Sequence, residues 1–240
     1  MTHSKSMTKE KKQIIIIMGA PGSGKGTQAE LLAERLNFYY FETSKILEEK
    51  FNKAKENEFI KADGKKYFLK DEKNLWKTGK LCSPPFVTYL VMEKIKKLYK
   101  EGKSLILSGS PRTIYESQKI VPLLKQLYGI NNIKVILINI TPKETIFRNS
   151  HRRICELMRH PVLYSKETKK IKKCPLDGSK LLKRAGLDDP ESIKVRLKEY
   201  KERTLPLMEH FKKEKLRTKE INGSPPPADV FKNILKAIKI

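Results

Sequence analysis

A glycine-rich stretch near the amino terminus contains the residue types that bind phosphate. It follows the isoleucine run that starts at Ile14 and combines glycines with a lysine and hydroxyls: Gly22, Ser23, Gly24, Lys25, Gly26 and Thr27. Glycines let backbone N–H groups approach phosphate oxygens without a Cβ in the way. A helix that starts here also presents its positive end to the same anion. The stretch therefore predicts binding of a nucleoside triphosphate, with Lys25 as a mobile cation and Thr27 as a hydroxyl that faces a metal.

The spacing differs from the usual phosphate-loop pattern G-x-x-x-x-G-K-[ST] by one position. Gly26 follows the lysine, and the hydroxyl residue comes one place later. The alternative is a glycine-rich turn that only joins a strand to a helix. The buried isoleucine run before it favours the phosphate loop.

Strand-like and helix-like segments alternate along the chain and would position this loop. Apolar runs predict strands, and segments with helical spacing lie after or between them: strands at Ile14 to Met18, Ser104 to Leu107 and Lys134 to Ile140, and helices at Thr27 to Leu36, Val87 to Leu98 and Ile114 to Leu127. Alternation of this kind predicts an α/β fold, with a central parallel sheet between two layers of helices.

The carboxyl-terminal part reads as two further helices. Apolar residues recur at helical spacing from Ile193 to Phe211, after a start at Pro190, and predict one long amphipathic helix. A last helix follows the prolines that end at Pro227 and runs to Ile238. Residues 1–12 are polar and charged and are predicted to be a flexible tail, so residues 13–240 would form one domain.

The net charge of +25 predicts attraction to polyanions. The excess is mostly lysine in helix-like stretches, such as 93–103 and 166–173, with no interleaved aromatic residues. This distribution favours a solvated surface over a nucleic-acid-reading site, although an RNA-associated protein stays an alternative.

No apolar run reaches the ~20 residues that span a bilayer, and no apolar signal segment is present, so we expect a cytoplasmic protein without a membrane partner. Three cysteines argue against a disulfide framework.

Five motifs occur in an order that resembles the adenylate kinases of the nucleoside monophosphate kinase superfamily. They are the phosphate loop, Thr43-Ser44-Lys45, Gly79-Lys80-Leu81, Gly109-Ser110-Pro111-Arg112-Thr113, and Arg152-Arg153 followed by a cysteine-bearing insert that ends at Asp188-Asp189. The resemblance implies a monomeric P-loop kinase with a monophosphate-binding subdomain at residues 42–82 and a lid at residues 151–189. It also implies reversible phosphoryl transfer from magnesium-bound ATP to AMP, which gives two ADP.

The resemblance also assigns roles to residues of this chain. The catalytic cations would be Lys25, Arg112, Arg152, Arg184 and Arg196. ATP would be held by the phosphate loop with Arg148 and Arg152, and Arg148 would lie against the base. The residues implied for the monophosphate are Thr43, Lys80, Leu81, Cys82, Gly109, Arg112, Glu116, Arg184 and Arg196. Arginine suits these tasks, since its planar fork holds two phosphate oxygens at once.

The chain departs from the family pattern at three of its positions. Ser108 stands where the family has an aspartate that organises water around magnesium, so either metal binding is weaker or another carboxylate compensates. Glu48 replaces an arginine that contacts the monophosphate, and Lys45 is our candidate substitute cation. Glu116 aligns with an adenine-contacting glutamine and could favour any base that carries an amino group. Thr43 favours adenine, and a kinase for CMP or UMP stays the alternative.

The cysteines of the insert resemble the ligands of a zinc-bearing lid. Cys155 and Cys174 with Asp177 fit the pattern, but Met158 occupies the second ligand position and is a poor zinc donor. His160 could complete a tetrahedral set of two thiolates, one imidazole and one carboxylate. The alternative is a lid held only by apolar contacts and hydrogen bonds.

Overall fold

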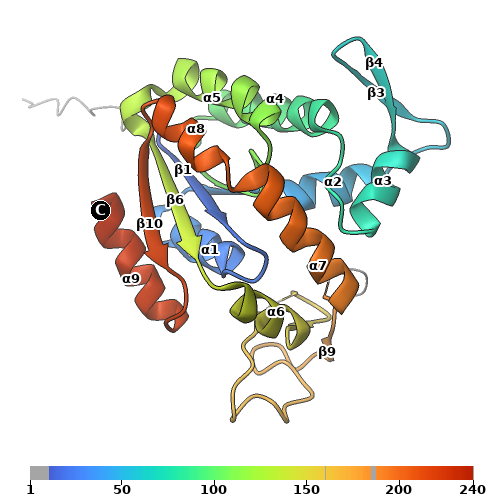
Figure 1. Ribbon diagram of the computed structural model, residues 1–240, viewed down its shortest axis with the longest axis vertical. Helices are drawn as coiled ribbons and strands as arrows, with labels where there is room; N and C mark the ends of the chain where they lie inside the picture. The colour runs from blue at the N-terminus through green and yellow to red at the C-terminus, as the bar shows by residue number, and fades with distance from the viewer. Residues whose placement is uncertain (1–10, 160, 185–187, 240) are drawn as a thin grey trace, which may run out of the picture.

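The computed structural model describes residues 11–159, 161–184 and 188–239. A parallel sheet with the order β10-β6-β1-β5-β2 forms its centre (Figure 1). These strands are β1 (Ile14–Gly19), β2 (Tyr39–Glu42), β5 (Leu105–Ser108), β6 (Ile133–Asn139) and β10 (Arg217–Asn222). The three strands predicted from the sequence, β1, β5 and β6, occupy the middle of the sheet. The part of the predicted tail that the structure describes, residues 11 and 12, has no regular secondary structure, and residues 1–10 lie outside the described residues.

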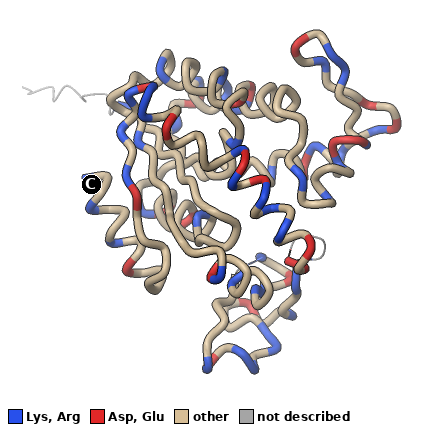
Figure 2. Tube along the Cα trace, viewed as in Figure 1, with Lys and Arg blue, Asp and Glu red and all other residues tan. Residues whose placement is uncertain are grey.

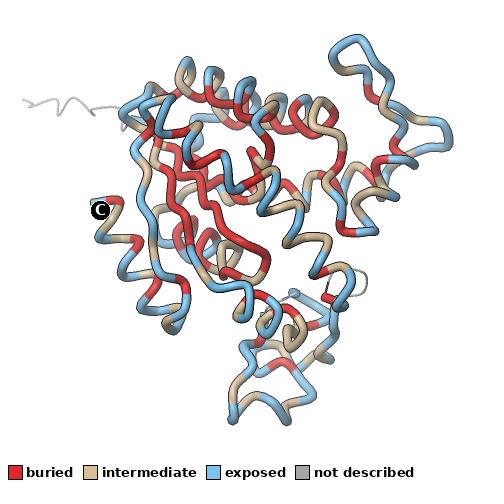
Figure 3. The backbone as a smooth tube through the Cα atoms, in the orientation of Figure 1, coloured by how far each residue is buried: buried red, intermediate tan, exposed pale blue. Residues whose placement is uncertain are grey.

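Alternating isoleucines of β1 divide the core into two layers. Ile15 and Ile17 pack with α1 and α9, whereas Ile14 and Ile16 pack on the opposite face with α4, α5 and α8. The helices are α1 (Lys25–Leu36), α4 (Pro84–Lys100), α5 (Ile114–Tyr128), α8 (Leu207–Lys213) and α9 (Pro227–Ile238). Because successive strand residues point to opposite faces, one apolar run serves both layers. Figure 3 shows the buried strands at the centre, and the predicted three-layer α/β fold is confirmed.

Residues 42–82 project from one end of the core as a small unit (Figure 1). The unit contains α2 (Thr43–Asn52), β3 (Phe59–Ala62), β4 (Lys65–Phe68) and α3 (Leu69–Lys77). β3 and β4 form an antiparallel hairpin. Ile60 and Leu69 from this unit are buried in the larger core cluster, which fixes the hairpin to α4.

A second small unit follows α6 (Pro142–Ser150). It contains a three-stranded antiparallel sheet with the order β8-β7-β9. The strands are β7 (Arg153–Cys155), β8 (Pro161–Val162) and β9 (Leu181–Leu182).

The prediction of one continuous helix from Pro190 to Phe211 is wrong, because the structure divides this range into separate segments. α7 (Pro190–Glu199) continues into a π-helical segment, η2 (Tyr200–Thr204), and α8 begins after Pro206. Proline has no backbone N–H and its ring displaces the preceding turn. The N–H of Leu205 accordingly donates to the carbonyl of Tyr200, five residues back, at 2.8 Å. The remaining short element is η1 (Ile130–Asn132), a 3₁₀ turn before β6.

Lysine and arginine are distributed over many elements rather than gathered at one place in the view of Figure 2. Blue segments occur on the helices, on the β3–β4 hairpin and on the unit that follows α6. No helix of the described residues is both long and apolar enough to cross a bilayer.

Candidate active site

A cleft of about 1050 Å³ opens at the carboxyl ends of β1, β2 and β5. In parallel α/β sheets this edge is where ligands bind, since loops there can converge on one space. Most of the site residues predicted from the sequence line it: residues 22–27, Lys80, Leu81, Gly109, Arg112, Arg148, Arg152, Arg184 and Arg196. Thr43, Cys82 and Glu116 are not among the lining residues.

The glycine-rich loop connects the end of β1 to the start of α1. Gly24 caps the helix with a φ of 88°, and Gly22 has a φ of 81°. A Cβ on Gly22 would meet Nδ2 of Asn149 at 2.6 Å, so only glycine fits between the loop and α6. The Nε2 amide of Gln28 donates to the carbonyl of Pro227 at 2.8 Å and ties α1 to α9. The backbone N–H groups at this helix start have no intrahelical acceptor and can bind an anion.

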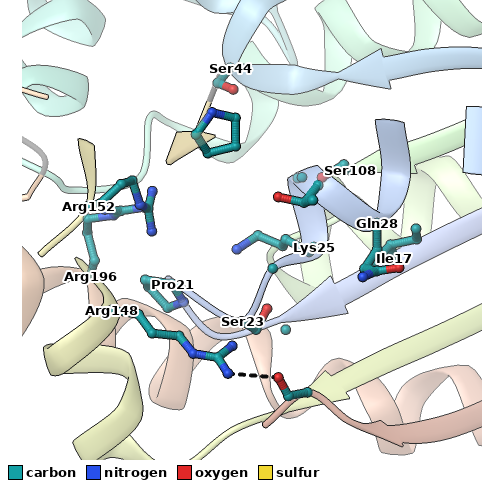
Figure 4. Close-up of a pocket in the computed structure, with 18 of the residues that line it drawn as sticks. Ile17, Pro21, Ser23, Lys25, Gln28, Ser44, Ser108, Arg148, Arg152 and Arg196 are labelled. Atoms are coloured by element: carbon teal, nitrogen blue, oxygen red, sulfur yellow. Dashed lines mark hydrogen bonds between the residues drawn. The ribbon is translucent and has the colours of Figure 1, made fainter. Parts of the chain in front are cut away.

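Lys25 lies half-buried in the cleft beside four arginines. Burial lowers the pKa of Lys25 well below its usual value, and the nearby charges of the arginines lower it further: Arg112, Arg196, Arg152 and Arg184, in decreasing order. Its Nζ donates to the carbonyl of Ala20 at 3.2 Å. Figure 4 shows Lys25, Arg152 and Arg196 approaching one space from different elements. The mutual repulsion of these cations indicates a site built for a strongly anionic ligand.

Asp188 holds three of these arginines together. Its Oδ1 lies 3.8 Å from Arg152, 3.0 Å from Arg184 and 3.7 Å from Arg196, and its side chain is only 1% exposed. One carboxylate cannot neutralise three guanidinium groups, so the cluster keeps positive charge for phosphate. The sequence reading placed Asp188-Asp189 at a helix start and missed this role. The structure divides the pair, since Asp189 alone caps α7 by accepting from the N–H of Ser192 at 2.9 Å.

Arg112 is held in the cleft by its own loop. Glu116 accepts hydrogen bonds from the N–H of Arg112 at 3.0 Å, from Thr113 Oγ1 at 3.1 Å and from Ser110 Oγ at 3.3 Å. Burial raises the pKa of Glu116, and these bonds oppose the rise. The carboxylate is therefore occupied within the loop, behind the cleft, where it supports Arg112.

Gly109 is the second position that requires glycine. Its φ is +98°, and a Cβ there would lie 3.1 Å from the guanidinium of Arg112 and 3.6 Å from Thr43 Oγ1. Thr43 is buried, and its Oγ1 has no hydrogen-bond partner among the described residues. Cys82 is also buried behind the cleft, where its Sγ donates to the carbonyl of Glu72 at 3.4 Å.

The two small units approach each other through charged side chains. Glu48 on α2 lies 3.7 Å from Arg159 of the 151–189 unit. Lys45 lies 3.6 Å from Glu42, and its side chain is 60% exposed. Glu48 and Lys45 both line the cleft, so a cation remains available near the position where Glu48 reverses the charge.

Arg148 supports the far end of the cleft. Its guanidinium donates to the carbonyls of Gly223 at 3.0 Å and Ser224 at 3.1 Å. A dashed line in Figure 4 marks a hydrogen bond of this guanidinium. The exposed ring of Phe147 and the prolines after Ser224 line the same end. Planar and apolar groups of this kind can sandwich a nucleobase.

Two cysteines and a carboxylate meet in the second small unit. The ligand atoms of Cys155, Cys174 and Asp177 all lie within 4.8 Å of one another. The Sγ of Cys155 donates to Oδ2 of Asp177 at 3.0 Å. Met158 is 62% exposed, and His160, the fourth ligand considered from the sequence, lies outside the described residues.

The comparisons with known proteins agree with this geometry. A sequence model of the family described as Adenylate kinase matches residues 17–216. The chain is 31% identical over 229 residues to an adenylate kinase of Chlamydia trachomatis serovar D, with 93% of this chain and 89% of the relative covered. It is 32% identical to adenylate kinases of Methanothrix thermoacetophila and Dehalococcoides mccartyi, with 93% and 94% of this chain and 97% of each relative covered. The chain therefore belongs to the adenylate kinase family and is a phosphotransferase that acts on nucleoside monophosphates.

Proposed function

We propose that this protein transfers the γ-phosphoryl group of magnesium-bound ATP reversibly to AMP. The observation that carries the proposal is the position of Lys25, which is half-buried at the start of α1, behind the glycine loop, and is accompanied by four arginines. Transfer between two polyanions needs positive charge at the junction and exclusion of water. Relatives that are named adenylate kinases over most of the chain support AMP as the acceptor.

The residues would divide the work by position. The N–H groups of the glycine loop and Lys25 would hold the β- and γ-phosphates, and Arg112 would hold the monophosphate. Arg152, Arg184 and Arg196, kept together by Asp188, would neutralise the transferring group. No covalent intermediate is needed, because positioning and charge stabilisation supply the acceleration. Arg148 would lie against the ATP base.

The acceptor base would be read by Thr43 rather than Glu116. Glu116 is buried and already accepts three hydrogen bonds within its loop. Thr43 Oγ1, in contrast, has no hydrogen-bond partner among the described residues. A hydroxyl can both donate to and accept from adenine. Lys80 and Leu81 would flank the monophosphate from the other side.

A panel of acceptors tests the proposal. ATP is combined with AMP, CMP, UMP or GMP, with and without magnesium, and formation of diphosphate is followed. We expect magnesium-dependent turnover with AMP at a kcat/KM at least about tenfold above the other three, which corresponds to about 1.4 kcal/mol of discrimination. A preference for CMP or UMP would replace AMP as the acceptor. No turnover together with salt-sensitive RNA binding would overturn the kinase assignment.

We also propose that residues 42–82 form the monophosphate-binding subdomain and residues 151–189 the lid. The ion pair between Glu48 and Arg159 supports closure of the two over the cleft, since the partners come from opposite units. Closure would remove water from the phosphates. We further propose that the protein is a monomer in solution, and light scattering would test this oligomeric state.

The lid would hold a structural zinc ion through Cys155, Cys174 and Asp177, with His160, which lies outside the described residues, as the predicted fourth ligand. Two thiolates and a carboxylate are ligands that zinc accepts, and their spacing fits one ion. Few described side chains of residues 151–189 are buried, namely Cys155, Val162, Cys174 and Asp188, so an ion would add stability that a small apolar core does not provide. Elemental analysis of purified protein should find about one zinc per chain. Zinc-free protein with an unchanged melting temperature would reject the ion.

A further inference from the structure

The strand β5 ends in Ser108, which provides no carboxylate for a magnesium ion. Proteins with a phosphate loop commonly hold magnesium between the loop hydroxyl and a carboxylate that follows a neighbouring strand. Magnesium prefers oxygen ligands, carboxylates and water above all. A serine at this position supplies a hydroxyl but no negative charge.

The neighbouring strand supplies a carboxylate at the same level. β2 pairs with β5 in a parallel register that places Glu42 directly beside Ser108. Adjacent strands lie about 4.8 Å apart, and residues in register point to the same side of a sheet. Glu42, Ser108 and Thr27 all line the cleft. The charge missing from β5 is therefore present one strand away.

Tyr40 connects this carboxylate to the start of α1. Its side chain lies on the same face of the sheet as Glu42, two residues further along β2, and Glu42 is in register with Ser108. The Tyr40 hydroxyl also lies close to Gly26, the residue before Thr27: a Cβ on Gly26 would be 3.6 Å from it. Tyr40 therefore links the strand that ends at Glu42 to the first turn of α1, which carries Thr27.

The other carboxylates that line the cleft lie on helices and do not end a strand of the central sheet. Glu144 closes the capping box of α6, and Glu48 faces Arg159. Glu199 accepts from Arg203 at 3.0 Å. Glu30 remains as a competitor, but it is an exposed residue on α1 and does not follow a strand.

We propose that Glu42 is the carboxylate that positions the magnesium ion of bound ATP, together with the hydroxyls of Thr27 and Ser108. Ser44 Oγ donates to Glu42 Oε1 at 2.7 Å and orients the carboxylate. Lys45 lies 3.6 Å from Oε2 on a largely exposed side chain, an interaction weak enough for a hydrated ion to replace. This inference rests on the proposed use of magnesium-bound ATP.

Calorimetric binding of ATP, measured with magnesium and with EDTA, tests the inference without turnover. In the wild type we expect magnesium to tighten ATP binding. Glu42→Gln should remove about tenfold or more of this gain while ATP binding in EDTA is not weakened. The double variant Glu42→Gln with Ser108→Asp should recover the gain, because it returns a carboxylate to the end of β5. Glu30→Gln is the matched control and should behave as the wild type.

The outcomes separate the inference from the function on which it rests. A wild type that binds no ATP overturns both. A wild type that binds ATP and gains from magnesium, with a Glu42→Gln variant that keeps the whole gain, overturns only the role of Glu42. Loss of the gain in Glu30→Gln instead would assign the ion to α1. An unchanged melting temperature of each variant in EDTA shows that a loss is not caused by unfolding.

Discussion

Replacing Lys25 with methionine should separate catalysis from folding. Methionine keeps the unbranched length of the side chain and removes its charge. Within the described residues the ammonium group donates a hydrogen bond to the carbonyl of Ala20 at 3.2 Å and lies near arginines that repel it. The substitution therefore removes the charge that would stabilise the transferring phosphoryl group but little that holds the fold.

The magnitudes follow from these contacts. Loss of a preorganised group that stabilises transition-state charge lowers kcat by about 10³, or about 4 kcal/mol. The lost hydrogen bond costs about 1 kcal/mol of folding free energy, and relief of repulsion offsets part of it. For a chain of this size, that difference shifts Tm by less than about 4 °C.

The same lysine gives the parent a pH signature. Its folded pKa is lowered below its unfolded value of 10.5. The unfolded state therefore binds more protons in the interval between the two values, and stability of the nucleotide-free parent rises with pH there. Lys25→Met should lack this contribution.

A coupled assay for ADP and a thermal melt, both on the same preparations, measure the two effects. Lys143→Met is the matched control, because Lys143 lines the same cleft on α6 but is exposed. We expect the control to keep parental turnover. Turnover of Lys25→Met within tenfold of the parent, at normal melting temperature, would refute the assigned role.

Three further predictions concern other parts of the site and fold. Lys45→Ala should raise KM for the monophosphate about tenfold at nearly unchanged kcat, since the proposed charge-assisted contact that compensates for Glu48 would be lost; steady-state kinetics measure it. Thr43→Val should raise KM for AMP without lowering Tm, because the methyl group replaces a hydroxyl that has no partner among the described residues. Glu214→Gln should cost about 0.5 kcal/mol at neutral pH, because it breaks the 2.5 Å contact with Lys125. This contact lowers the pKa of Glu214 below 4.5, so the stabilisation exists above pH 4.5 and disappears as the pH falls; melts across pH 3 to 7 follow it.

Two of these predictions have a matched control in the chain. Lys50→Ala, on the same helix as Lys45 but paired with Glu58, should leave KM unchanged. Glu93→Gln, at an exposed pair with Lys96, should not alter the pH profile of stability. A Lys45→Ala enzyme with parental KM would remove Lys45 as the substitute cation. A lower Tm of Thr43→Val would indicate a structural hydroxyl, and a pH-independent loss for Glu214→Gln would reject the ion pair.

The strands predicted from the sequence are those buried on both faces. β1, β5 and β6 are apolar runs, whereas β2 and β10 lie at the edges of the sheet. β10 contains exposed charged residues such as Lys219 and Glu220. Edge strands need only one covered face and carry polar residues on the other, so their sequences do not stand out from loops. The sequence did contain a signal for the division between α7 and α8, because Pro206 lies inside the range predicted as one helix.

The site was predictable where chemistry requires one residue type in a fixed order. The glycine loop and the arginines carry such a signal, and the structure brings them together in the cleft. The partners that hold these groups were not predictable, because Asp188 and Glu116 act through contacts that depend on loop geometry. Glu42 became informative only when the register of β2 placed it beside Ser108.

The most direct test of the central claim is a thermal melt with a bisubstrate mimic, in which five phosphates join two adenosines. The glycine loop and the converging cations should hold both halves at once. At a concentration about 1,000 times Kd, the mimic should stabilise the magnesium-containing protein by about 4 kcal/mol, or a Tm increase of about 8 °C or more. An unchanged Tm at every concentration would contradict a site that holds two phosphate chains end to end.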